Sequence, residues 1–353
     1  MPQLLLVRSE NHDPWRNLAL EEHLVRLLAA EAGQPEGIRG ILYLWQNQNT
    51  VVIGRNQNAW TECQTGLLES DGGRLARRTT GGGAVYHDLG NLNFSLILPR
   101  RKFNLEDNFA LIIAAVSSQG IKAERSGRND VLAQGRKFSG NAFSLRQDAG
   151  LHHGTLLVDS DYGRLARYLT VSPSKLQAKG VASVKSRVIN LCDLNPSLTV
   201  TAMALAMEDA FLRQPPAGLG AAETGQRQVL RTTDADYRDD PELEKTYRHF
   251  ASWSWRYGES IRFDAMIEKR MDWGHVEIGL NVEKGVVSKA TIYSDALDSD
   301  FIEMMASKLC GCRFQSTAMA AAVAQKPGQG NGFGPPRELM VNDIAELILE
   351  QNW

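Results

Sequence analysis

The sequence predicts an α+β protein with two domains. Its 353 residues are enough for two domains of ordinary size. In the first part, a segment of helical periodicity at 14–28 is followed by short apolar runs typical of strands, such as 41–45. Near the C-terminus, apolar residues alternate at 276–282 and the pattern resumes at 286–293, which predicts an antiparallel hairpin. Helices at 299–309 and 338–350 would cover it, so a smaller α+β domain is expected from about residue 246.

Composition indicates an ordinary globular protein. Hydrophobic residues make up 43% of the chain, charged residues 23%, and the formal net charge is -2. This balance gives no overall attraction to nucleic acid or to an acidic membrane, so we expect neither as a partner. The apolar start is short and lacks the features of a signal peptide, and no apolar run has the length of a membrane span.

The four cysteines indicate a reducing, cytoplasmic setting. They are few for the length and form no C-x-x-C pair, so buried or incidental thiols are expected rather than disulfides or a zinc site. These residues are Cys63, Cys192, Cys310 and Cys312.

Further elements of the first domain follow from local signals. Asp13 and Pro14 are typical of the N-cap and first residue of a helix. Apolar residues at helical spacing predict a helix within 104–118. A strand is expected at 4–7, and the remaining predicted elements are short helices at 67–71 and 162–169 and strands at 50–54 and 151–158.

The most informative stretch is 77–88, Arg-Arg-Thr-Thr-Gly-Gly-Gly-Ala-Val-Tyr-His-Asp. Glycine lets the backbone approach a ligand closely, successive N–H groups can surround an anion, and arginine suits phosphate or carboxylate. The stretch therefore indicates a loop for a nucleotide or another anion. The glycine spacing is neither that of a Walker A loop nor that of a Rossmann fingerprint. Strand patterns at 84–86 and 92–98 leave a glycine-rich hairpin without a ligand as an open alternative.

A second cluster surrounds Lys137 in 135–142, Gly-Arg-Lys-Phe-Ser-Gly-Asn-Ala. Small neighbours would let the lysine ammonium lie close to a bound group, although a solvated surface lysine is the ordinary alternative. His152 and His153 lie in the strand predicted at 151–158. Because neighbouring strand residues face opposite sides, the two imidazoles are not expected to chelate one metal, and no metal ligand is assigned.

Taken together and in this order, the motifs resemble those of the lipoate–protein ligase A family, in its bacterial form with a C-terminal accessory domain. Each motif is weak alone, but the ordered combination is specific, and the resemblance covers nearly the whole chain. Two departures are a short segment between Asp130 and Lys137 and a Gly- and Pro-rich insertion at 326–337. The matching motifs are 77–88, 127–130 (Gly-Arg-Asn-Asp), 137–142 (Lys-Phe-Ser-Gly-Asn-Ala), 152–157 (His-His-Gly-Thr-Leu-Leu) and 179–184 (Lys-Gly-Val-Ala-Ser-Val).

The resemblance implies a two-step, adenylate-forming ligase. Such an enzyme activates (R)-lipoate with ATP and Mg²⁺ to lipoyl-AMP and releases pyrophosphate. It then lipoylates a lysine of apo lipoyl domains, in the E2 subunits of 2-oxoacid dehydrogenases or in the glycine-cleavage H protein. The implied fold is a mixed β-sheet catalytic domain resembling biotin protein ligases and class II tRNA synthetases. That domain would span 1–245, with its core at about 31–218, and the accessory domain 246–353.

The resemblance also implies roles for particular residues. Lys137 would be the catalytic cation, near both the lipoate carboxylate and the α-phosphate. Besides Lys137, the expected ATP and adenylate contacts are Arg78, Gly83, Ala84, Val85, Tyr86, Asn129 and Asp130. The expected lipoate contacts are Lys137, Gly82, His153 and Gly154.

Three alternatives stay open at this point. An octanoyl or lipoyl transferase of the same fold would use a cysteine nucleophile, but the comparable stretch at 169–174 has none, and Cys192 has no recognisable base nearby. A biotin ligase would need a biotin motif that the sequence does not show. A non-catalytic protein that binds lipoyl-adenylate or a carrier domain is disfavoured by Lys137 and by the complete 78–86 segment.

Overall fold

The computed structural model describes residues 3–31, 34, 37–170, 186–213, 216, 228–258, 264–325, 327–328, 330, 332, 334–351 and 353. The 179–184 motif and the greater part of the cysteine-free stretch at 169–174 therefore lie outside the described residues. Contacts divide the chain into two compact units, which are described separately.

The first unit is built on a large mixed β-sheet. Strand β1 pairs in parallel with β2 and β11, whereas the pairs from β2 through β6, β10, β9, β8 and β7 are antiparallel. In spatial order the strands are β11 (Gln228–Thr233), β1 (Gln3–Arg8), β2 (Ile38–Trp45), β6 (Asn91–Pro99), β10 (Ala149–Leu157), β9 (Arg136–Leu145), β8 (Asp130–Ala133) and β7 (Glu124–Ser126). The predicted α+β class with a mixed sheet is confirmed.

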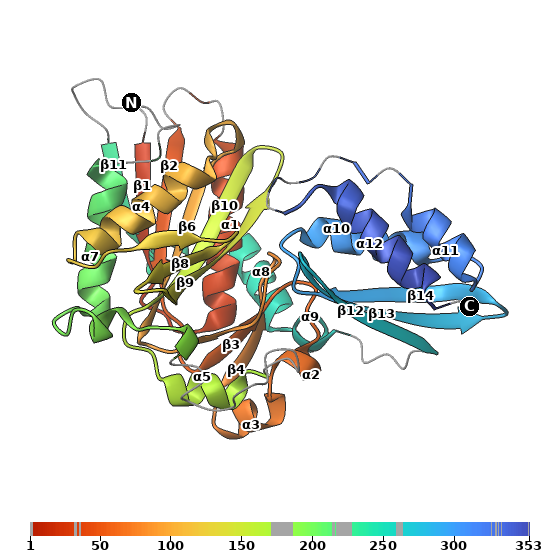
Figure 1. The fold of residues 1–353 in the computed structure, drawn as a ribbon. Coiled ribbons are helices and arrows are strands. Elements are labelled where there is room, and N and C mark those ends of the chain that lie inside the picture. Colours follow the sequence, from red (N-terminus) through yellow and green to blue (C-terminus); the bar gives the residue numbers. More distant parts are fainter. Residues whose placement is uncertain are drawn as a thin grey trace. The chain divides into compact units, whose positions relative to one another are not determined.

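Helices cover both faces of this sheet (Figure 1). Helices α1 (Pro14–Ala30) and α8 (Pro241–Ala251) pack together on one face, and α4 (Leu105–Ser117) and α7 (Val200–Arg213) on the other. The predicted cap of α1 is confirmed, because the Asp13 carboxylate accepts hydrogen bonds from the N–H groups of Trp15 and Arg16. Buried leucines of α1 and the apolar residues of β2 form the core on that side.

A smaller three-stranded sheet carries the glycine-rich segment. Its order is β4 (Arg74–Arg77), β3 (Thr50–Ile53) and β5 (Val85–His87). Strand β5 pairs with β3 and not with β6, so the segment from Arg77 to Ala84 connects the two outer strands of this sheet. The segment is therefore not the loop of a hairpin, because the strands on either side of it, β4 and β5, are in one sheet but are separated there by β3. The chain also forms the short helices α2 (Ala59–Glu62), α3 (Thr65–Ser70), α5 (Tyr162–Tyr168) and α9 (Trp253–Tyr257), of which α5 packs against β5 and α3.

The short segment between Asp130 and Lys137 is a tight hairpin. Residues Gln134 and Gly135 have φ values of 51° and 72°, and Ala133 pairs with Arg136 across the turn. Two residues with positive φ are typical of the turns that match the twist of antiparallel strands. Strand β9, which follows, contains all of the second cluster except Gly135.

The second unit contains a three-stranded antiparallel sheet covered by helices (Figure 1). The predicted hairpin is confirmed as β13 (Gly274–Glu283) and β14 (Val286–Ser294), with β12 (Ala265–Met271) pairing on the other side. Helices α10 (Ser299–Leu309), α11 (Ser316–Val323) and α12 (Arg337–Leu349) bury apolar residues against this sheet.

Two short segments from the first half of the chain also belong to the second unit. Ile53–Glu62 and Arg77–Ala84 group with Tyr257–Trp353. The predicted domain boundary at 245 falls inside helix α8, whose residues all belong to the first unit. Sequence order therefore does not follow the division into compact units.

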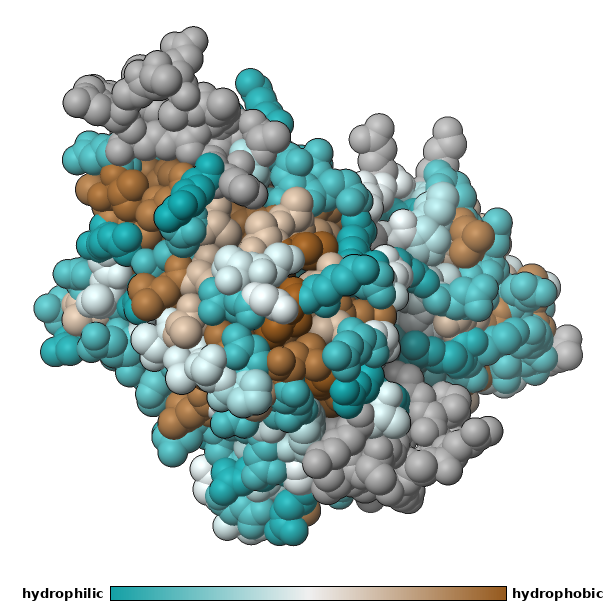
Figure 2. Space-filling view, turned by 60° about the vertical axis from the view of Figure 1, so that its left-hand side comes forward, coloured by the Kyte–Doolittle hydropathy of each residue, from teal (hydrophilic) through white to brown (hydrophobic). Residues whose placement is uncertain are grey.

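The surface mixes charged and apolar side chains. On the face shown in Figure 2, hydrophilic residues surround separate apolar patches. Large apolar side chains such as Leu205 of α7, 55% exposed, are ordinary when they occur singly. Within the described ranges, no helix is long and apolar enough to cross a membrane.

Candidate functional site

Lys137 lies on β9 beside the end of β8. Its Nζ is 2.7 Å from Oδ1 of Asp130, and both side chains remain about one-third exposed. Asp130 pairs with Gly140 in the β8–β9 ladder. A Cβ atom at Gly140 would lie 2.9 Å from both Cε and Nζ of Lys137, so a larger residue there would displace the end of the lysine side chain. Gly140 therefore leaves open the space in which the ammonium of Lys137 lies.

The turn before β8 is tied to β9 by paired asparagines. Asn141 donates from its backbone N–H and from its side-chain Nδ2 to the carbonyl of Asn129, at 2.9 and 3.0 Å. Asn129 Nδ2 donates in return to the carbonyl of Asn141, at 3.1 Å. Three hydrogen bonds thus hold Asn129, the residue directly before Asp130.

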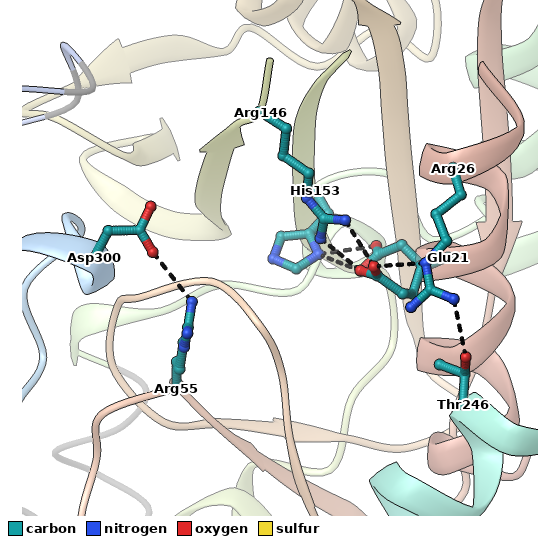
Figure 3. Close-up of polar contacts among 8 residues, drawn as sticks. Glu21, Arg26, Arg55, Arg146, His153, Thr246 and Asp300 are labelled. Carbon is teal, nitrogen blue, oxygen red and sulfur yellow. Dashed lines mark hydrogen bonds and ion pairs between the residues drawn. The ribbon is translucent and has the colours of Figure 1, made fainter. Parts of the chain in front are cut away.

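His153 is held by the buried carboxylate of Glu21 (Figure 3). Its Nδ1 lies 2.9 and 3.0 Å from the two oxygens of Glu21 on α1. Glu21 also accepts a hydrogen bond from Ser95, whose hydroxyl oxygen accepts one from Trp45 Nε1. Because a carboxylate only accepts, the proton of His153 stays on Nδ1 and the ring orientation is set.

His152 faces the other side of β10 and has different partners. Its ring is surrounded by Phe94, Phe109 and Phe143, with ring centroids 4.7 to 5.5 Å away. Burial lowers the pKa of His152 well below its ordinary value, so the ring is neutral. The two histidines thus have separate surroundings, as strand alternation predicts. Within the described part of the chain, no group of three or more His, Cys, Asp or Glu side chains could hold a metal ion.

Two buried arginines lie at the start of the glycine-rich segment. Arg77 donates from Nη1 to the carbonyls of Gly54, Arg55 and Gln57, at 2.6 to 3.2 Å. Burial lowers the pKa of Arg77 to about 10, so the guanidinium stays charged at neutral pH. Arg78 donates to the carbonyls of Gly81 and Gly83, each at 2.8 Å. The structure therefore gives Arg78 a role in holding the loop, and its contact with a nucleotide stays a prediction.

Accessible backbone in this segment is confined to a few residues. Gly82 has φ +91°, which favours glycine, and its N–H donates to the carbonyl of Ala296 at 3.2 Å. Gly83 is exposed, and Ala84 and Val85 are half-buried. Tyr86 is buried, its hydroxyl donates to Asn49 Oδ1, and burial raises its pKa to about 12. Gly83 is therefore the residue of the Gly81–Gly83 run that is open to a ligand in this structure.

The predicted site residues fall into two groups. The first unit contains Lys137, Asn129, Asp130, His153, Gly154, Val85 and Tyr86. The second unit contains Arg78, Gly82, Gly83 and Ala84. Neighbouring strands bring the Lys137 group together, since Gly154 of β10 pairs with Asn141 of β9 and Asp130 of β8 pairs with Gly140.

Residues 13–212 match the model of the lipoyl protein ligase A/B catalytic domain. The chain belongs to the lipoyl protein ligase A/B family. Residues 260–348 also match the model of the bacterial lipoate protein ligase C-terminus. The predicted membership of a lipoate–protein ligase family with a C-terminal domain is thus confirmed, and this is a family of enzymes.

Solved structures of lipoate ligases resemble this family member along most of its length. P. falciparum LipL1, in complex with lipoate, is 28% identical with a TM-score of 0.81 and covers 99% of this chain and 100% of its own. A chain from a bi-partite lipoate protein ligase and its E2 lipoyl domain from Thermoplasma acidophilum is 25% identical, with a TM-score of 0.59 and coverages of 75% and 99%. A lipoate-protein ligase A bound with ATP, 24% identical with a TM-score of 0.57 and coverages of 73% and 99%, shares the fold.

Three residues of this lipoyl ligase family member were missed by sequence reasoning. The sequence indicates Arg77 only as an arginine suited to an anion, Asn141 only as part of a motif, and Glu21 only as a residue of a helix. Asn141 could have been found from the sequence, because a polar residue within a buried strand needs a hydrogen-bond partner. Glu21 had no local signal, since its partner His153 is 132 residues away.

Proposed function

We propose that this protein is an ATP-dependent lipoate–protein ligase. It activates lipoate to lipoyl-AMP and then transfers the lipoyl group to a lysine of apo lipoyl domains, in E2 subunits of 2-oxoacid dehydrogenases or in the glycine-cleavage H protein. The observation that carries the proposal is the placement of Lys137, whose ammonium lies over Gly140 and is paired with Asp130 in a partly open position. Relatives described with lipoate and with an E2 lipoyl domain support the substrate and the acceptor.

The first step joins two anions. A lipoate carboxylate oxygen attacks the α-phosphorus of ATP, the bond from that phosphorus to the bridging oxygen breaks, and pyrophosphate leaves. The carboxylate and the phosphate repel each other, so a fixed cation between them lowers the barrier. Lys137 is proposed as that cation, and its Asp130 partner holds the ammonium until the substrates replace part of that contact.

The remaining predicted residues take supporting roles in this proposal. The backbone of Gly83, Ala84 and Val85 contacts the nucleotide, and Arg78 keeps that backbone in shape through the carbonyls it binds. Tyr86 contributes backbone, and Asn129 and Asp130 border the phosphates. Gly82, His153 and Gly154 contact lipoate. Mg²⁺ commonly binds through phosphates and one or two carboxylates, and Asp130 is the carboxylate that fits such a position.

The second step needs no nucleophile from this chain. The acceptor lysine amine attacks the acyl carbon of lipoyl-AMP, the bond from that carbon to the phosphate oxygen breaks, and AMP leaves. The site has to exclude water during this step, because the mixed anhydride hydrolyses easily.

Cysteine-based acyl transfer is disfavoured by the surroundings of Cys192. Its Sγ donates to Oδ1 of Asp159 at 3.3 Å, and burial together with that carboxylate raises the pKa of the thiol to about 11. A thiol with such a pKa is protonated at neutral pH and is a poor nucleophile.

The deciding experiment is intact-mass analysis of an apo lipoyl domain incubated with this protein, ATP, Mg²⁺ and lipoate. We expect a lipoyl mass gain that requires ATP and is lost in Lys137→Ala, while circular dichroism shows that the variant remains folded. Pyrophosphate release is measured in parallel. Pyrophosphate release without a mass gain of the lipoyl domain would support adenylation and would show that this domain is not an acceptor. Neither signal from folded wild-type protein would overturn the proposal in favour of a binding protein.

A further inference from the structure

His152 is a buried polar residue to which the proposed reaction assigns no role. It is 0% exposed, and three phenylalanines surround its ring. Its Nε2 lies 2.9 Å from Oδ1 of Asn141. Its Nδ1 is buried and makes no hydrogen bond within the described residues. A buried histidine with one polar contact is costly unless that contact is useful to the structure.

The direction of this hydrogen bond is determined by the other contacts of Asn141. Its Nδ2 donates to the carbonyl of Asn129, which can only accept, and lies 3.1 Å from the hydroxyl of Ser139. The Oδ1 atom of Asn141 therefore faces His152, and the neutral ring must donate from Nε2–H. The imidazole thus holds the Asn141 amide in the orientation that binds Asn129.

The surrounding packing keeps the Asn141 amide in place. A Cβ atom at Gly154 would lie 2.5 Å from Oδ1 of Asn141 and 2.8 Å from Phe94, so a glycine is needed opposite it on β10. Asn141 is itself only 4% exposed. The amide therefore has little freedom to turn unless its partner is lost.

The contact leads directly to the proposed catalytic lysine. Of the three hydrogen bonds between Asn141 and Asn129, the Asn141 amide supplies one and the Asn141 backbone takes part in the other two, and Asn129 is joined to Asp130 by one peptide bond. The carboxylate of Asp130 lies 2.7 Å from Lys137 Nζ. The turn before β8 also includes Gly127, whose φ of +58° favours glycine.

We propose that His152 and Asn141 are positioning residues for adenylation: they fix the turn before β8 and so place Asp130 against the Lys137 ammonium. This inference rests on the proposed function, since the placement of Asp130 against Lys137 matters for catalysis only if the protein forms lipoyl-AMP. Small displacements of a reacting group can cost about 10²-fold in rate, which gives such a contact a measurable effect.

The test compares His152→Leu, which removes the donor, with His152→Gln, whose amide can donate to Asn141. Asn141→Ala is a second variant that leaves the aromatic surroundings of His152 intact. Asn108→Leu is the control, because Asn108 is buried in α4 and its side chain makes no hydrogen bond within the described residues. Pyrophosphate release is measured against lipoate and ATP concentration for each folded variant.

We expect His152→Leu and Asn141→Ala to lower kcat about tenfold to hundredfold with KM values changed much less, and His152→Gln to restore kcat to within about threefold of wild type. Asn108→Leu should match wild type. A loss in His152→Gln equal to that in His152→Leu, or no loss in either donor-removing variant, would overturn the inference.

A double-mutant cycle with Asp130→Asn separates positioning from a general loss of structure. If His152 acts through Asp130, His152→Leu should cost less in the Asp130→Asn background than in wild type. Equal costs in the two backgrounds would contradict the proposed route.

Hydrogen exchange gives a readout that does not need activity. Amides of residues 127–133 should exchange faster in His152→Leu and Asn141→Ala than in wild type, and near the wild-type rate in His152→Gln. If wild-type protein releases no pyrophosphate, the proposed function fails, and unchanged exchange in the variants would separately refute the positioning contact.

Discussion

Single charged residues in this protein differ mainly by what surrounds them. Arg77 and Arg78 are buried, and their guanidinium groups donate to backbone carbonyls, those of 54–57 for Arg77 and those of its own loop for Arg78. Lys137 is partly open and has one carboxylate partner. A charge that is already enclosed by carbonyls builds structure, whereas one with a replaceable partner is available to a substrate.

The ion pair of Arg337 and Asp298 should be important for the second unit. Two guanidinium nitrogens donate to the two carboxylate oxygens at 2.8 and 2.9 Å, and Asp298 also caps helix α10. Removing one partner of a buried pair leaves an uncompensated charge, so Arg337→Ala should lower the free energy of unfolding of this unit by about 3 kcal/mol. Denaturant unfolding followed by hydrogen exchange of α10 and α12 measures the change.

A matched control is Arg270→Ala. Arg270 contacts Asp295 in the same unit at 2.8 Å, but its side chain is 47% exposed. An exposed pair contributes about 0–1 kcal/mol, so this variant should unfold nearly like wild type. Similar losses in the two variants would mean that the burial of the Arg337 pair does not matter.

At the scale of elements, the connection between β4 and β5 depends on glycine at particular positions. Gly82 has φ +91° and a hydrogen bond to Ala296, and Gly54 lies so close that a Cβ there would meet the carbonyl oxygen of Gly82 at 2.2 Å. In this segment Gly81 and Gly82 are buried, Gly83 is exposed, and Ala84 and Val85 are half-buried.

Gly82→Ala should impair this connection. Alanine is strained at this φ, so we expect a loss of about 1–2 kcal/mol and at least a several-fold rise in KM for ATP in pyrophosphate release. Gly66→Ala is the control, since Gly66 lies in helix α3 with nothing within 4 Å of an added Cβ. An unchanged KM in folded Gly82→Ala would remove the segment from the proposed nucleotide site.

Helices and strands were predicted correctly where the signal lay in neighbouring residues, and were missed where they depend on pairing with a distant strand. The cap at Asp13, the helix at α4 and the β13–β14 hairpin were read from adjacent residues, and all are present. Strand β11 was missed because its edge pairing with β1 joins residues more than 200 positions apart. The hairpin alternative for the glycine segment failed because β5 pairs with β3, and not with β4 or β6.

At the scale of the molecule, His152 should make the first unit sensitive to acid. Above about pH 6.5 the ring is neutral in both folded and unfolded chains, so it adds no pH dependence. Below that pH the unfolded chain binds a proton that the buried ring, near His153 and Arg125, resists. The free energy of unfolding should therefore fall by up to about 1.4 kcal/mol per pH unit.

The check is denaturant unfolding between pH 7 and pH 5, followed by hydrogen exchange of β9 and β10. His152→Gln lacks the titrating group and should show a smaller slope than wild type. Parallel slopes for the two proteins would show that His152 is not the source of the acid sensitivity.

The sequence by itself determined the family, the α+β class and the residues that carry the proposed chemistry, because ordered motifs and local periodicity are properties of neighbouring residues. Only the tertiary structure decided that Arg78 binds its own loop, that Glu21 holds His153, and that the Ile53–Glu62 and Arg77–Ala84 segments join the second unit. The reason is physical: a buried polar group takes the partner that packing brings within about 3 Å, and that partner can lie anywhere in the chain.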